Sequence, residues 1–115
     1  ARQNDEFCLR MLDASRHALA STWLEDQQHS LGEMPPERSR QLVAKLHRLG
    51  AAAIHVCQIK VHANGTENSG HLVVELPATP AKRASLLKEL DRLAREQGYE
   101  GDLDDGQRYA YVKLD

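Results

Sequence analysis

Aromatic residues are scarce in this sequence of 115 residues, which holds one Phe, three Tyr and one Trp. A hydrophobic core therefore has to be built mainly from Leu, Val, Ile and Ala. No apolar run approaches the ~20 residues that a membrane-spanning helix needs, so we predict no membrane span. The hydrophobic fraction of 41% favours a globular chain over a disordered one. At this length we expect one domain, covering residues 1–115.

An excess of basic residues is also missing, because the formal net charge is −2. A dedicated duplex binder usually carries a net positive charge, so the composition argues against nucleic acid as a partner. Cys8 and Cys57 are the only cysteines, and their spacing fits no metal or redox motif. We expect two buried thiols in a reducing cytoplasm, with a disulfide as the alternative. The sequence begins at Ala1 without a signal peptide, which leaves an upstream signal or anchor open.

The clearest positive signal is a β-hairpin between Ile54 and Leu76. Residues 54–62 and 71–76 are rich in β-branched side chains, which is typical of strands. Asn64 and Gly65 begin the polar connection between them. Both residue types tolerate positive φ, so this pair favours an antiparallel hairpin.

The N-terminal region is predicted to form one long amphipathic helix. Asn4 or Asp5 can cap its start, and the apolar pattern continues to Trp23. The residues on its apolar half are Phe7, Cys8, Met11, Leu12, Ala14, Ala18, Leu19 and Trp23. A helix of ~20 residues is long for so small a domain. We therefore expect its wide apolar face to contact a partner chain as well as its own sheet.

Two further helices and a last strand complete the predicted fold. The helices follow Pro36 and Pro80, which suit the first position of a helix, and end at Gly50 and Gly98. Residues 108–114 alternate with a period of two and predict a strand. The predicted order is two helices followed by β-β-α-β. This gives an α+β fold with a small antiparallel sheet and its helices on one face.

In layout alone, residues 36–114 resemble the α-β-β-α-β portion of a ferredoxin-like sandwich. The first strand of that fold is absent or replaced in this order of elements. The resemblance rests on no sequence motif, and this fold carries many unrelated functions. It therefore implies an architecture and no activity.

The period of two also assigns the faces of the predicted sheet. The sets expected to face the helices are Cys57, Ile59, Val61 and Ala63, then Leu72, Val74 and Leu76, then Ala110, Val112 and Leu114. Tyr109, Tyr111 and Lys113 then point to an open face, where tyrosines can stack on the bases of single-stranded nucleic acid. On an open face, Tyr111→Ala should barely change the melting temperature.

No catalytic, metal-binding or cofactor-binding residue is predicted. His55, Cys57, His62 and His71 carry possible zinc ligands, but in no CxxC or HxxxH spacing. The acidic residues of segment 99–106 do not follow the pattern of an EF-hand loop. There is also no phosphate-binding glycine loop, nucleophile elbow or HExxH motif.

These observations lead to one leading hypothesis about function and two alternatives. The leading hypothesis is a small non-enzymatic interaction or regulatory module that forms a homodimer or binds a protein partner. The alternatives are a binder of small ligands or single-stranded nucleic acid on the open sheet face, and a small enzyme centred on Cys57 and the nearby histidines. The predicted interaction surface comprises Lys60, His62, Tyr109, Tyr111, Lys113, Phe7, Met11 and Trp23.

Overall fold

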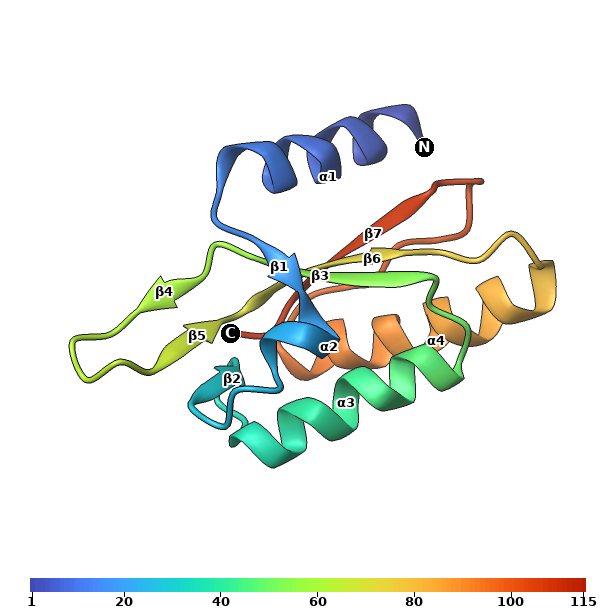
Figure 1. Cartoon of the computed structure of the whole chain (residues 1–115). Coiled ribbons are helices and arrows are strands. Elements are labelled where there is room, and N and C mark those ends of the chain that lie inside the picture. Colours follow the sequence, from blue (N-terminus) through green and yellow to red (C-terminus); the bar gives the residue numbers. More distant parts are fainter.

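The computed structural model covers residues 1–115 and has an α+β fold built around a four-stranded sheet (Figure 1). The helices are α1 (Arg2–Ala14), α2 (Ala20–Trp23), α3 (Pro36–Arg48) and α4 (Pro80–Glu96). The strands are β1 (Ala18–Leu19), β2 (His29–Leu31), β3 (Ala53–Cys57), β4 (Lys60–Val61), β5 (Glu67–Ser69), β6 (His71–Glu75) and β7 (Tyr109–Lys113). The predicted class and its small antiparallel sheet are confirmed. No helix combines the length and the hydropathy that crossing a membrane requires.

The main sheet has the strand order β1-β3-β6-β7, and every neighbouring pair is antiparallel. This arrangement is consistent with the predicted ferredoxin-like-related layout, in which the first strand was expected to be absent or replaced. β7 pairs directly with β6, and the two-residue β1 lies at the opposite edge beside β3. The outer edge of β7 therefore has no strand beside it.

The predicted hairpin is present and antiparallel, with Ile54 opposite Val74. Between β3 and β6, the strands β4 and β5 form a second sheet with β2, and this arm projects from the body of the protein (Figure 1). Gln58 has a positive φ of 51° and turns the chain between β3 and β4. Gly65 supplies the left-handed residue of the turn at the tip, with a φ of 87°.

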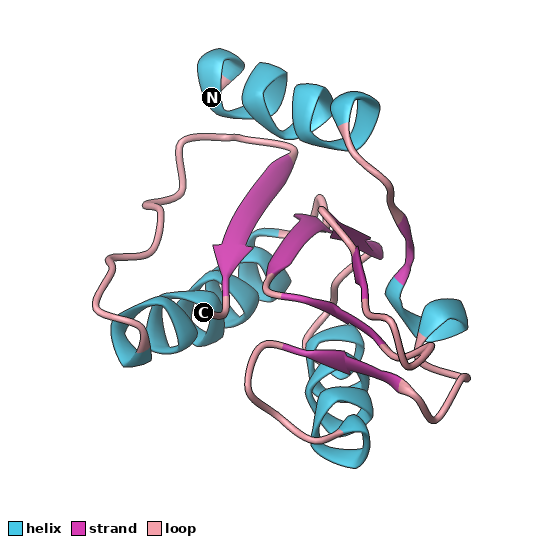
Figure 2. Ribbon diagram, turned by 90° about the vertical axis from the view of Figure 1, so that its left-hand side faces the viewer, coloured by secondary structure: helices cyan, strands magenta, loops and turns pink.

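Helices cover both faces of the main sheet (Figures 1 and 2). A cluster of 20 buried apolar residues, with members from α2, α3 and α4, fills one side. On the other side α1 packs on the sheet through a much smaller cluster. Its buried members are Cys8, Cys57, Val73 and Tyr109. The expectation that the helices share one face is therefore wrong for α1.

The predicted long first helix is also wrong. α1 ends at Ala14, and Ser15 is extended at φ −134° and ψ 162°. The hydroxyl of Ser15 donates a hydrogen bond to the carbonyl of Met11 and accepts one from the N–H of Gln58. Ala18 and Leu19 then pair with β3, because the edge of that strand offers hydrogen bonds that continued helix would leave unused. The apolar pattern thus runs through three separate elements.

The expected sheet faces are right for two strands and wrong for β3. Leu72, Val74, Ala110 and Val112 lie in the large core as predicted. In β3 that side is occupied by Ile54 and Val56, while Cys57 faces α1. The left-handed conformation of Gln58 interrupts the alternation, so the residues before and after it cannot share one continuous pattern.

Candidate ligand pocket at the free edge of β7

A cavity of about 270 Å³ lies against β7, between α1, α4 and the loop that follows α4. We call it the β7 pocket. Its lining residues are Asn4, Phe7, Leu87, Leu90, Ala94, Tyr99, Glu100, Gly101, Asp102, Ala110, Tyr111, Val112 and Lys113. α4 contributes an apolar floor, α1 the roof, and residues 99–102 the outer rim. Because β7 is the edge strand, this pocket occupies the place where a further strand would lie.

The rim of the pocket is held in place by α4. The N–H of Gly101 donates a hydrogen bond of 2.9 Å to a carboxylate oxygen of Asp91. A Cβ on Gly101 would lie 2.6 Å from the Cα of Asp91, so only glycine fits this approach. Farther along the loop, Arg83 forms an ion pair of 2.7 Å with Asp104. The acidic segment 99–106 is largely exposed, and these contacts hold its first part in position as a wall of the pocket.

The main chain of Tyr111 is free to pair within the pocket. The N–H of Leu76 bonds to the carbonyl of Arg108, and the N–H of Leu114 bonds to that of Gly70. In an antiparallel ladder these bonds fall on alternate residues. The N–H and C=O of Tyr109 and Tyr111 therefore point away from β6, towards the free edge.

The helix α1 uses the first of these two free positions. Asn4 donates its side-chain amide to the carbonyl of Tyr109 at 2.7 Å, and the carboxylate of Asp5 accepts from the N–H of Tyr109 at 3.1 Å. Tyr111 has no corresponding side-chain partner for its main chain. The main-chain N–H and C=O of Tyr111, and by the same alternation those of Lys113, thus remain for an occupant of the pocket.

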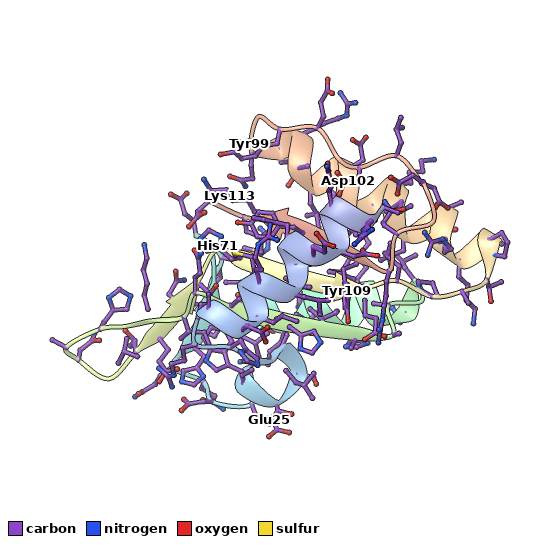
Figure 3. All side chains as sticks on the ribbon, turned by 90° about the horizontal axis from the view of Figure 1, so that it is seen from above. Glu25, His71, Tyr99, Asp102, Tyr109 and Lys113 are labelled. Atoms are coloured by element: carbon purple, nitrogen blue, oxygen red, sulfur yellow. The ribbon has the colours of Figure 1, made fainter.

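Aromatic residues gather at the β7 pocket. Phe7, Tyr99 and Tyr111 are three of the five aromatic residues of the chain. The rings of Phe7 and Tyr111 meet edge to face with centroids 5.3 Å apart. The ammonium group of Lys113 lies 5.5 Å from the centroid of Tyr99, and Figure 3 shows these two residues together on one side of α1. Phe7 and Tyr99 are still 40% and 44% exposed.

The groups beneath the aromatic cluster are uncharged near neutral pH. Burial raises the pKa of the Tyr111 hydroxyl to about 12 and lowers the pKa of His71. The Tyr111 hydroxyl lies 2.5 Å from Nδ1 of His71, and the two rings stack. At the rim, partial burial and the nearby Asp105 raise the pKa of Asp102. The pocket therefore combines an apolar interior with two carboxyl groups, those of Glu100 and Asp102, and the ammonium group of Lys113 near its edge.

The two thiols beneath α1 are poorly suited to nucleophilic chemistry. Cys8 and Cys57 are fully buried and unbonded. Burial raises the pKa of Cys8 to about 12 and that of Cys57 to about 11. Because the thiolate is the reactive form, both side chains are held in their unreactive state. No three His, Cys, Asp or Glu side chains come together to surround a metal ion.

The predicted interaction residues do not form one surface. Phe7, Tyr111 and Lys113 line the β7 pocket, whereas Tyr109 is buried under α1 and Met11 is half-buried beside it. Lys60 and His62 are exposed on the projecting arm. Trp23 lies in the large core and donates its indole N–H to Glu67.

The tyrosine-bearing face was expected to be open, and this is wrong because α1 covers it. The proposed stacking surface for nucleic-acid bases is therefore occupied by a helix.

Sequence reasoning also missed Asn4, Tyr99 and Asp102. Tyr99 and Asp102 stand in a loop whose position beside β7 depends on the contacts of Asp91 and Arg83. No periodic pattern in the sequence carries that information.

Comparison with known proteins gives no match to a family model, to a curated protein or to a solved structure.

Proposed function

We propose that this protein is a non-enzymatic binding module that holds a small, largely apolar ligand in the β7 pocket. The observation that carries this proposal is the convergence of three aromatic side chains and a free main-chain donor and acceptor on one cavity of about 270 Å³. Ligand sites typically have an apolar lining with a few placed polar groups. The volume lies just below the usual range of about 300–1,000 Å³ for ligand pockets, which suits a small ligand.

The surroundings of the pocket favour its interpretation as a binding site and not as an ordinary gap in the packing. Exposed aromatic side chains grouped at one place mark binding surfaces more often than scattered ones do. The rim is also positioned by a close glycine contact and an ion pair, so the cavity has a defined shape. The hollows on the outer side of α4 are larger, but they are lined mostly by polar and charged side chains and lack aromatic residues.

The homodimer predicted from the sequence stays a prediction. It was expected because a long first helix would have offered a wide apolar face to a second copy. α1 is shorter than expected and uses Cys8, Met11 and Leu12 against its own sheet. The remaining exposed apolar residues, such as Leu19 and Val61, lie on different elements.

The test is an NMR titration of the labelled protein with indole and benzamide as probes. We expect shift changes centred on Phe7, Tyr99 and Tyr111, and about tenfold weaker binding in Tyr99→Ala, because base-like rings gain ~1–3 kcal/mol from aromatic contact. Val61→Ala is the matched control, since Val61 is exposed and apolar but lies on the arm. Shift changes scattered over the surface, or binding that Tyr99→Ala leaves intact, would contradict the proposal.

A further inference from the structure

The free edge of β7 inside the pocket presents the hydrogen-bonding pattern of a strand that lacks its neighbour. Tyr111 offers one N–H and one C=O, which is what an extended chain pairs with when it adds to a sheet. Below this edge, Leu87, Leu90 and Ala94 of α4 form an apolar floor. A chain lying along Tyr111 would place one side chain on that floor.

Pairing along β7 cannot extend towards the start of the strand. The main-chain groups of Tyr109 are already bonded to Asn4 and Asp5. An added chain therefore has to begin or end beside Tyr111. At the other end of the pocket, the next hollow along α4 measures about 210 Å³ and is lined in part by Leu93, Gln97 and Leu114. The chain can continue in that direction.

The charges decide which terminus fits the blocked end. Asp102 lines the pocket, and Figure 3 shows it towards the Tyr109 end of β7, away from Tyr99 and Lys113. It has no hydrogen-bond or ion-pair partner among the surrounding side chains. A terminal carboxylate would meet this acidic group unfavourably, whereas a terminal ammonium would pair with it. Lys113 stands at the opposite end of the pocket, beside Tyr99.

We infer, building on the binding function proposed above, that the β7 pocket takes the N-terminal residue of an extended peptide. Its α-ammonium group lies at Asp102, its first peptide group pairs with the main chain of Tyr111, and its first side chain rests on Leu87, Leu90 and Ala94. The preferred first residue is apolar. The peptide leaves the pocket past Lys113 and runs parallel to β7.

The experiment compares the tripeptide amide Leu-Ala-Ala, with a free N terminus, with its N-acetylated form by calorimetric titration. We expect the free form to bind at least about tenfold more tightly, as one charge-assisted hydrogen bond provides. Asp102→Asn should reduce this preference to about threefold or less. The control is Glu25→Gln, because Glu25 is exposed, unpaired and remote from the pocket (Figure 3), and it should leave the preference unchanged.

The outcomes separate this inference from the proposed function. Equal binding of the free and acetylated peptides would overturn the role of the ammonium group. Equal binding of 3-methylbutylamine and the free tripeptide would overturn pairing with the Tyr111 main chain. If indole and benzamide bind the pocket and neither peptide does, the peptide inference fails while the binding function stands. If none of these probes binds, both fail.

Discussion

The two faces of the main sheet are packed by different means. The side of α3 and α4 holds 20 buried apolar residues, most of them Leu, Val and Ile. The side of α1 buries four residues, and two of these are cysteines and one is a tyrosine. The half-buried His55 and His71 lie beside them on the strands. The larger apolar burial on the first side should supply most of the stability of the fold. The second side contributes Asn4, Phe7 and Tyr111 to the β7 pocket.

The largest expected effect tests this division directly. Leu86→Ala should lower the free energy of unfolding by about 2–5 kcal/mol, because Leu86 is fully buried in the large core and its loss leaves a cavity. Cys8→Ala removes an equally buried side chain under α1 and should cost only about 1 kcal/mol. Urea unfolding of both variants provides the comparison. Equal losses would show that the two sides contribute alike.

The next effect measures what the tyrosine adds on the α1 side. Tyr111→Ala should lower the free energy of unfolding by about 1–2 kcal/mol, because the ring is half-buried against Phe7 and His71. This replaces the expectation from sequence that the melting temperature would barely change. Tyr111→Phe keeps the ring and should cost about 1 kcal/mol through loss of the hydrogen bond to His71. An unchanged melting temperature in Tyr111→Ala would mean that the ring makes no stabilising contact and that Tyr111 is an ordinary surface residue.

A substitution in the rim separates the shape of the pocket from the stability of the fold. Gly101→Ala brings a methyl group against the backbone of Asp91, so the rim has to move. We expect about 1 kcal/mol of destabilisation together with at least about tenfold weaker binding of indole. Chemical unfolding and NMR titration measure the two quantities. Intact binding would mean that the rim does not shape the site. Ala84→Gly, on α4 at another hollow, is the control for a small change nearby.

Acidification should act on the α1 side of the sheet first. Burial lowers the pKa of both His55 and His71 below the ordinary value of 6.5, so folding favours the neutral imidazoles. Their contribution to stability is complete above the unfolded value and is lost as the pH falls through the lowered values. The melting temperature should therefore decrease from about pH 7.5 to about pH 5.5. His71→Gln should flatten this decrease, and His62→Gln, at an exposed position on the projecting arm, should not.

The smallest effects are expected on the projecting arm. Lys60→Ala and His62→Ala replace exposed side chains that make no ion pair. Each should change the free energy of unfolding by less than about 0.5 kcal/mol and leave indole binding unaltered. A loss of indole binding in either variant would show that the arm is part of the binding site. It would contradict the assignment of that site to the β7 pocket.

Local patterns in the sequence were sufficient for the elements that pack on the large core. α3, α4 and the hairpin have regular apolar spacing and strong start and stop residues, and they occur where those signals lie. The apolar residues of α1, β1 and α2 also have helical spacing, although the chain leaves the helix at Ser15. There, pairing with β3 and the contact of Ser15 with Gln58 override the periodicity.

The candidate site was only partly accessible from sequence. The alternation in β7 correctly placed Tyr111 and Lys113 on the side away from α3 and α4. The roof and rim depend on contacts between residues that are distant in sequence, such as Asn4 with Tyr109. A single sequence gives no signal for such contacts, because local periodicity does not indicate which distant residues will meet.

The hydrogen bond between Asn4 and Tyr109 joins residues 105 positions apart, and those of Asp5 span nearly as much of the chain. Closing so large a loop is entropically costly, and contacts of long sequence separation form slowly. The hairpin, α3 and α4 can assemble from residues 36–114 without waiting for α1. We therefore expect the roof of the β7 pocket to form in the final step of folding, so that the folding chain has a core before it has a place to bind.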